Sequence, residues 1–232
     1  NDLRSQPASR FRQIQPDRLK PVSPFLRFRT AMWKRGCSLR RRQRGQPITS
    51  HRTLAIDCAT AACSVALFEG ERLLSAAHEV LGRGHAERLV PMIADLPERG
   101  RASSIAVARG PGSFTGVRIG LAVARSLAFA WGATPQGYST MALVAAMARQ
   151  QAGAQVLTVA MEGGHGEWFV QGFDGDGCAL AETRSLRPED AVAAFPSTLV
   201  AGTVAEDFVA RAGSGSALRL HSDAREFRTL PE

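Results

Sequence analysis

The sequence has no long apolar run and few cysteines. No stretch of 18 apolar residues occurs among its 232 residues, although a membrane-spanning helix needs roughly 20. Nothing resembles a signal peptide with a central apolar core. The four cysteines contain no CxxC pair and are too few for a disulfide framework, so we expect reduced thiols. Together these absences predict a soluble, cytoplasmic protein without a membrane segment.

Histidine is also scarce, and this limits the chemistry that the chain can carry. None of the five histidines lies between His85 and His165. A metal site on a helix needs two imidazoles on one face, typically four residues apart, and no such pair is present. No nucleophile elbow or Ser, His and Asp motif stands out either. The sequence therefore predicts neither a bound metal nor a hydrolase triad.

Acidic residues are rare only at the start of the chain. Residues 1–50 hold 13 Lys and Arg against 2 Asp and Glu, whereas the rest holds 16 against 19. The formal net charge of +8 therefore belongs to a basic leader, residues 1–51, which we expect to be disordered. A non-native upstream extension is favoured for it, with an RNA-binding arm, a transit peptide or a partner-binding tail as alternatives.

The most informative stretch runs from Gly110 to Trp131 and reads GPGSFTGVRIGLAVARSLAFAW. Its first three residues force a turn after an apolar strand, and Ser113 or Thr115 can cap the helix that follows. Residues four apart then form a ridge of small side chains: Gly116, Gly120, Ala124 and Ala128. Polar surface is confined to a narrow seam, which favours a second partner surface over simple coverage of a sheet. Burial between this chain's own elements is the alternative.

We interpret this helix as a partner interface on which a homodimer and a heterodimer would compete. The predicted interface residues are Ser113, Phe114, Gly116, Gly120, Val123, Ala124, Leu127 and Ala128.

Three blocks of sequence resemble the TsaB (YeaZ) family, bacterial proteins that help to install threonylcarbamoyladenosine on transfer RNA. Leu54–Leu67 reads LAIDCATAACSVAL, and the glycine-rich stretch above is the second block. The third is a His-x-x-Arg-Leu-x-Pro-Met pattern made by His85, Arg88, Leu89, Pro91 and Met92. Together the blocks span roughly residues 52–173 in the family's order and spacing, and in combination they are highly specific.

The resemblance implies an α/β fold like that of actin, Hsp70 and the sugar kinases. Such a fold has two lobes with duplicated mixed sheets and flanking helices. We expect the first lobe at residues 52–152, with a strand at Ser104–Ala108, and the second at residues 153–232, with its third strand near Leu180–Thr183. Because the family usually continues for a further helix and strand, the second lobe is expected to be incomplete.

The same resemblance places two candidate phosphate loops. Asp57 and Thr60 lie in a polar turn between two strands, where the alternative is that Asp57 is a turn residue that bonds the amide or hydroxyl of Thr60. The second loop, Met161–Trp168, reads MEGGHGEW where the family usually has Asp-Ala-Arg-x-Gly-Glu. The residues assigned to weak nucleotide binding are Asp57, Thr60, Gly110, Gly112 and Glu162.

The resemblance implies a non-catalytic subunit that pairs with the TsaD transferase and is joined by the ATPase TsaE. It would reach transfer RNA through this complex, and in isolation it would form a homodimer. The alternative is a standalone ATP-dependent phosphotransferase or hydrolase of the actin-like superfamily. Two departures favour the accessory subunit without a cofactor. The second loop has Glu162 and Gly164 in place of the family's usual aspartate and arginine, and Gly137–Ala146 lacks the histidine pair that binds metal in TsaD. Cys58, where the family more often has threonine, also weakens the first loop as a phosphate site.

Overall fold

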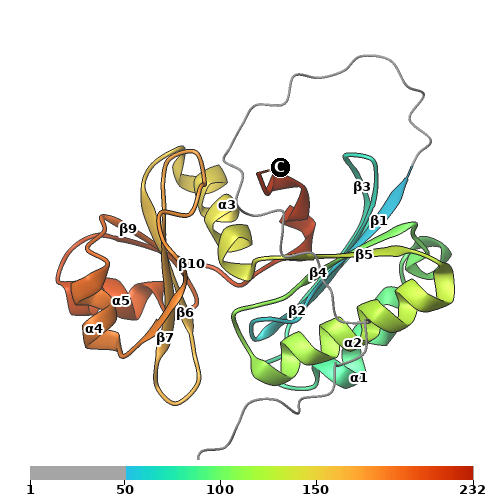
Figure 1. Cartoon of the computed structure of the whole chain (residues 1–232), viewed down its shortest axis with the longest axis horizontal. Coiled ribbons are helices and arrows are strands. Elements are labelled where there is room, and N and C mark those ends of the chain that lie inside the picture. The colour runs from blue at the N-terminus through green and yellow to red at the C-terminus, as the bar shows by residue number, and fades with distance from the viewer. Residues whose placement is uncertain (1–50, 232) are drawn as a thin grey trace, which may run out of the picture. The chain divides into compact units, whose positions relative to one another are not determined.

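The computed structural model describes residues 51–231, so the predictions for the basic leader lie outside the described residues. Figure 1 shows the chain. The first-lobe elements are β1 (Arg52–Asp57), β2 (Ala62–Glu69), β3 (Arg72–Val80), α1 (His85–Ala94), η3 (Pro97–Gly100), β4 (Ser104–Ala108), α2 (Phe114–Trp131), β5 (Thr134–Tyr138) and α3 (Thr140–Ala152). The second-lobe elements are β6 (Leu157–Glu162), β7 (Trp168–Phe173), β8 (Arg184–Leu186), α4 (Pro188–Ala194), β9 (Leu199–Gly202), α5 (Ala205–Ala212), β10 (Ser216–Arg219) and η4 (Ala224–Thr229).

The two five-stranded sheets have the same topology. Their strand orders are β3-β2-β1-β4-β5 and, read in the equivalent direction, β8-β7-β6-β9-β10. In each sheet the first strand pairs antiparallel with the second and parallel with the fourth. The predicted duplication of mixed sheets with flanking helices is thereby confirmed.

The first sheet is buried on both faces, which explains the continuous apolar sequence of β1. Leu54 and Ile56 pack with side chains of α1 and α2. Ala55, between them in the strand, faces the opposite side, where Leu143 of α3 and Phe227 of η4 contribute. Successive residues of a strand point to opposite faces, so one short segment supplies both cores.

Helix α3 contributes to the cores of both sheets. Its residues Leu143 and Met147 belong to the cluster on the first sheet, whereas Met141 and Val144 pack with strands of the second. The hydroxyl of Ser139 accepts a hydrogen bond from the Ala142 amide and caps the helix. A helix with apolar residues on two sides is therefore required at this position.

The second lobe differs from the sequence prediction in two respects. Its third strand was expected at Leu180–Thr183, but β8 begins at Arg184 and is largely exposed, so no apolar alternation marked it. Neither β10 nor η4 was predicted, and β10 gives this sheet the same five strands as the first. That the lobe lacks pieces beyond this sheet stays a prediction. Among the residues that the structure describes, no helix is long and apolar enough to cross a membrane.

The ridge of small residues on α2 is buried against this chain's own first sheet. All four members, Gly116, Gly120, Ala124 and Ala128, are buried, and a Cβ atom at Gly116 would lie 2.0 Å from the Cys58 carbonyl oxygen. At Gly120 it would meet Val107, Cys58 and Ile56. The prediction that these four residues face a partner is therefore wrong. A helix that packs closely on a sheet needs small side chains for the same steric reason as a helix that packs on another subunit.

Replacement of Gly116 by alanine tests this close approach. We expect the unfolding free energy to fall by about 1–3 kcal/mol, because overpacking against a backbone carbonyl outweighs the roughly 1 kcal/mol that alanine gains over glycine within a helix. Urea denaturation followed by circular dichroism measures the change. Gly164→Ala is the matched control, since a Cβ atom there has no neighbour within 4 Å. Equal stability of the two variants would contradict the packing of α2 described above.

Candidate functional site

The turn between β1 and β2 holds a buried carboxylate, Asp57, which is 0% exposed. Its Oδ1 accepts hydrogen bonds from the Ala59 amide at 2.9 Å and the Ser222 hydroxyl at 2.7 Å. Its Oδ2 accepts one from the Tyr138 hydroxyl at 3.1 Å. Both oxygens are thus bonded to groups of this chain, which matches the local-turn interpretation better than an open phosphate loop. The amide partner is that of Ala59 rather than the predicted Thr60.

Burial dominates the electrostatics of this turn. Loss of hydration raises the pKa of Asp57 above its usual value, and the hydrogen bonds from Ala59, Ser222 and Tyr138 oppose that rise only in part. The pKa of Tyr138 is also well above its usual value, first because the phenol is buried and second because Asp57 lies beside it. A buried acid that accepts three hydrogen bonds serves to position its donors.

Thr60 belongs to the same hydrogen-bonded group. Its Oγ1 accepts the Ala62 amide at 3.2 Å and lies 3.3 Å from the Ser222 hydroxyl. Because the Ser222 proton is donated to Asp57, the Thr60 hydroxyl is the donor to Ser222. Ser222 and Tyr138 were missed in the sequence, since they lie 165 and 81 residues from Asp57 and no local pattern connects them.

The glycine loop before α2 packs on this turn. A Cβ atom at Gly112 would lie 2.1 Å from the Ala59 carbonyl oxygen, and that oxygen accepts the Ser113 amide at 2.7 Å. The Gly110 carbonyl accepts the Thr140 amide at 3.1 Å. Ser113, one of the two predicted caps, accepts the Gly116 amide at 3.2 Å. The space that the glycines provide is therefore filled by backbone of the same chain.

Glu162, the fifth candidate nucleotide residue, ends β6 in the second sheet. Glu162 is exposed, and its backbone amide donates to the Thr203 hydroxyl at 2.9 Å. The next amide, of Gly163, donates to the Glu167 carbonyl at 2.8 Å. The two backbone amides that could have bound a phosphate are thus hydrogen-bonded within the chain. The exposed Glu162 carboxylate is a group of this turn that faces solvent.

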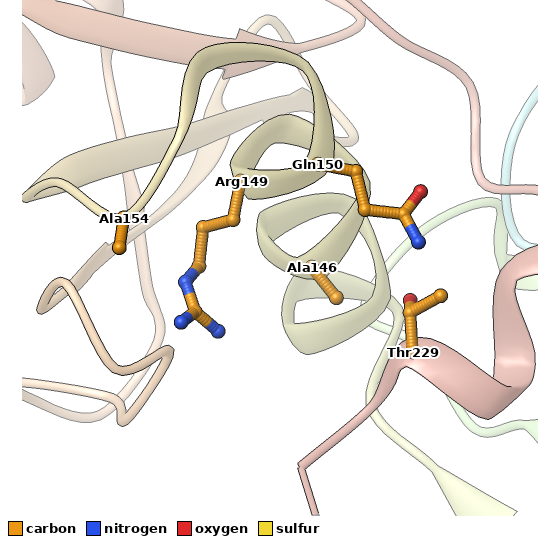
Figure 2. Close-up of a pocket in the computed structure, with 5 residues that line it drawn as sticks. All are labelled: Ala146, Arg149, Gln150, Ala154 and Thr229. Carbon is orange, nitrogen blue, oxygen red and sulfur yellow. The ribbon is translucent and has the colours of Figure 1, made fainter.

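A separate hollow lies beside α3 and contains none of these candidate residues. Its volume is about 360 Å³, and Ala146, Arg149, Gln150, Ala154 and Thr229 line it. Figure 2 shows that the Arg149 and Gln150 side chains leave α3 in different directions. Across residues 51–231, no three of the His, Cys, Asp and Glu side chains gather in an arrangement that could hold a metal ion.

The outer face of α2 carries two exposed aromatic residues among small and polar side chains. Phe129 is 93% exposed and Phe114 is 69% exposed, and the Arg118 guanidinium lies 3.5 Å from the centre of the Phe114 ring. Val123 and Leu127 are partly buried against the first core. Of the predicted interface residues, Ser113 and Phe114 are exposed. Exposed aromatic and arginine side chains are enriched at protein interfaces.

Comparisons with known proteins agree with one another. A family model described as "TsaD: tRNA N6-adenosine threonylcarbamoyltransferase" matches residues 78–221. The protein "tRNA threonylcarbamoyladenosine biosynthesis protein TsaB" of Escherichia coli (strain K12) is 38% identical over 130 residues, 54% of this chain and 56% of that protein. The protein of the same name from Bacillus subtilis (strain 168) is 32% identical over 103 residues, 41% of this chain and 44% of that protein. The chain thus spans about half the length of the curated relatives it matches.

A solved structure covers more of the chain. "YeaZ from Pseudomonas aeruginosa" is 33% identical, aligns with 78% of this chain and 90% of that chain, and has a TM-score of 0.68. The structural likeness therefore includes both lobes rather than a single motif. The chain belongs to the TsaB (YeaZ) family.

Proposed function

We propose that this chain acts in the biosynthesis of threonylcarbamoyladenosine on transfer RNA as a non-catalytic subunit. In this proposal it pairs with the TsaD transferase, the ATPase TsaE joins the pair, and transfer RNA is reached through the complex. The names of the relatives support the pathway. The observation that carries the non-catalytic role is the sealed Asp57 carboxylate, whose two oxygens accept hydrogen bonds from Ala59, Ser222 and Tyr138.

An ATP-dependent enzyme of this fold needs carboxylates that can reach magnesium and water at facing loops. In the present structure Asp57 is buried, and the amides of Glu162 and Gly163 are engaged. The rival standalone phosphotransferase or hydrolase would have to release several hydrogen bonds before it could bind a nucleotide. No observation in the described residues favours it over the accessory subunit.

The outer face of α2, not the small-residue ridge, is the surface that we assign to the partner. Phe114 and Phe129 are exposed at either end of the helix, and Val90 of the neighbouring α1 is 55% exposed. Burial of this face would remove apolar area from water without disturbing the first core. A homodimer formed through the same face would exclude the transferase, because one surface holds one partner.

The double variant Phe114→Ser with Phe129→Ser tests this surface. We expect the dissociation constant for TsaD to rise about 30-fold or more, which corresponds to about 2 kcal/mol, because aromatic anchors dominate such interfaces. Isothermal titration calorimetry measures binding, and a reaction reconstituted with TsaD, TsaE and transfer RNA measures the modified adenosine. The matched control is Leu180→Ser, which removes a residue that is 60% exposed in the second lobe. Unchanged binding of the folded double variant would place the interface elsewhere.

The buried state of Asp57 predicts a distinctive pH dependence. An acid whose pKa is higher in the folded protein binds its proton more tightly there. Folding stability therefore falls as pH rises from the unfolded pKa of about 4 towards the folded value. Asp57→Asn removes this penalty and retains an oxygen for Ala59 and Ser222. We expect its stability relative to the natural protein to increase between about pH 4 and pH 7.

Urea denaturation of both proteins across this range measures the difference. Asp57→Ala is the control, and we expect it to be less stable than Asp57→Asn by about 2 kcal/mol or more, because it leaves the buried donors of Ala59 and Ser222 unpaired. A stability difference between Asp57→Asn and the natural protein that stays constant or shrinks with rising pH would show that Asp57 is readily ionised, as an open phosphate loop requires.

A further inference from the structure

Two cysteines, Cys58 and Cys63, face each other across the turn between β1 and β2. The register of these antiparallel strands ends with Asp57 opposite Ser64, so its continuation puts Cys58 opposite Cys63. Directly opposed residues of an antiparallel pair have Cα atoms about 4.5 or 5.5 Å apart. That separation lies within the roughly 4.4–6.8 Å range found across disulfides. The backbone therefore holds the two cysteines at a spacing that a disulfide accepts.

The side chains confirm this juxtaposition. The two Sγ atoms lie 3.6 Å apart and share a hydrogen bond, and both thiols are free and buried. Within residues 51–231, neither cysteine belongs to a group of three or more His, Cys, Asp or Glu side chains that could hold a metal ion. The third described cysteine, Cys178, lies in the second lobe and is partly exposed. The thiol pair is thus distinct from an isolated core cysteine, for which no partner sulfur is within reach.

We propose that Cys58 and Cys63 form a dithiol that is reversibly oxidised to an intramolecular disulfide by a hydroperoxide. The Cys63 thiolate attacks one oxygen of hydrogen peroxide and becomes a sulfenic acid, with release of hydroxide. The Cys58 thiol then attacks the sulfenic sulfur, forms the S–S bond and expels a second hydroxide. Its proton goes to the first hydroxide, and the second hydroxide takes up the proton that Cys63 lost to solvent when it became a thiolate. In sum, two thiols and one hydrogen peroxide give one disulfide and two waters.

Either sulfur can donate the hydrogen bond between them, and donation from Cys58 is the arrangement that leaves Cys63 as the attacking thiolate. The thiolate is the reactive form of cysteine, and donation from Cys58 lowers the pKa of Cys63 although burial opposes this. The pKa of Cys58 is raised by the same hydrogen bond and then by burial. Because both sulfurs are covered, a small oxidant is required, and disulfides of this transient kind are the form found in reducing compartments.

The turn that carries the pair is bonded to several other elements. The Ala59 carbonyl accepts the Ser113 amide at the start of α2, and the His85 side chain at the start of α1 lies 3.0 Å from the Thr60 carbonyl. A disulfide between Cys58 and Cys63 would therefore constrain the turn to which the first residues of both helices are hydrogen-bonded. This inference goes beyond the proposed function and does not depend on it.

The test uses the full chain and a variant with Cys37→Ser and Cys178→Ser, which keeps only the dithiol. Each is treated with hydrogen peroxide while folded, then unfolded and alkylated with N-ethylmaleimide. We expect the variant to accept two alkyl groups when reduced and none after oxidation, with recovery in dithiothreitol. Peptide mapping of the full chain should give a Cys58–Cys63 cross-link that is two hydrogen atoms lighter than the dithiol. Circular dichroism before and after treatment checks that the protein stays folded.

The matched control adds Cys63→Ser to this variant, so that Cys58 stands alone. We expect its remaining thiol to be lost at least tenfold more slowly than the first thiol of the pair, because the reactive thiolate is absent. The proposal is overturned if both thiols of the folded pair stay open to alkylation under conditions that fully oxidise free glutathione. It is equally overturned if the only disulfides found join two chains, or if Cys58 alone reacts as fast as the pair.

Discussion

Burial of the Asp57 carboxylate ties together parts of the chain that are far apart in sequence. Its donors come from Ala59 in the same turn, from Tyr138 at the end of β5 and from Ser222 after β10. An ionisable group without water must find such partners or cost several kcal/mol. The segment after β10 must therefore return to the first sheet, where Ala224 donates its amide to the Ser64 hydroxyl at 2.9 Å and η4 completes the core.

The duplicated sheets place acidic residues at equivalent strand ends but in unlike surroundings. Asp57 ends β1 and is fully buried, whereas Glu162 ends β6 and is exposed. Gly112 and Gly116 are packed against the backbone of the first turn. The duplicated architecture thus holds one strand-end carboxylate by contacts within the chain and leaves the other exposed, and the fold alone does not specify an activity.

Most of the fold could be predicted from local sequence, because strands with continuous apolar residues and helices with clear caps leave strong signals. The strand at Ser104–Ala108 and the Ser113 cap are examples that the structure confirms. The misses have physical reasons. Strand β8 is short and exposed, and the partners of Asp57 depend on tertiary contacts. The opposition of Cys58 and Cys63 could have been read from the hairpin register, which places residues with equal offsets from the turn side by side.

The orientation of α2 explains why the small-residue ridge faces the first sheet and why the exposed face of the helix is the one that we assign to a partner. An apolar helix with only a narrow polar seam gives no direction by periodicity alone. Side-chain size shows which face of the helix packs on the sheet, because the face that approaches a backbone most closely must carry the smallest residues. Gly116 meets this condition at the Cys58 carbonyl, which fixes the rotation of the helix. In that rotation Phe114, Arg118 and Phe129 point outward. The Arg118 guanidinium covers the Phe114 ring, whereas the Phe129 ring is exposed to water.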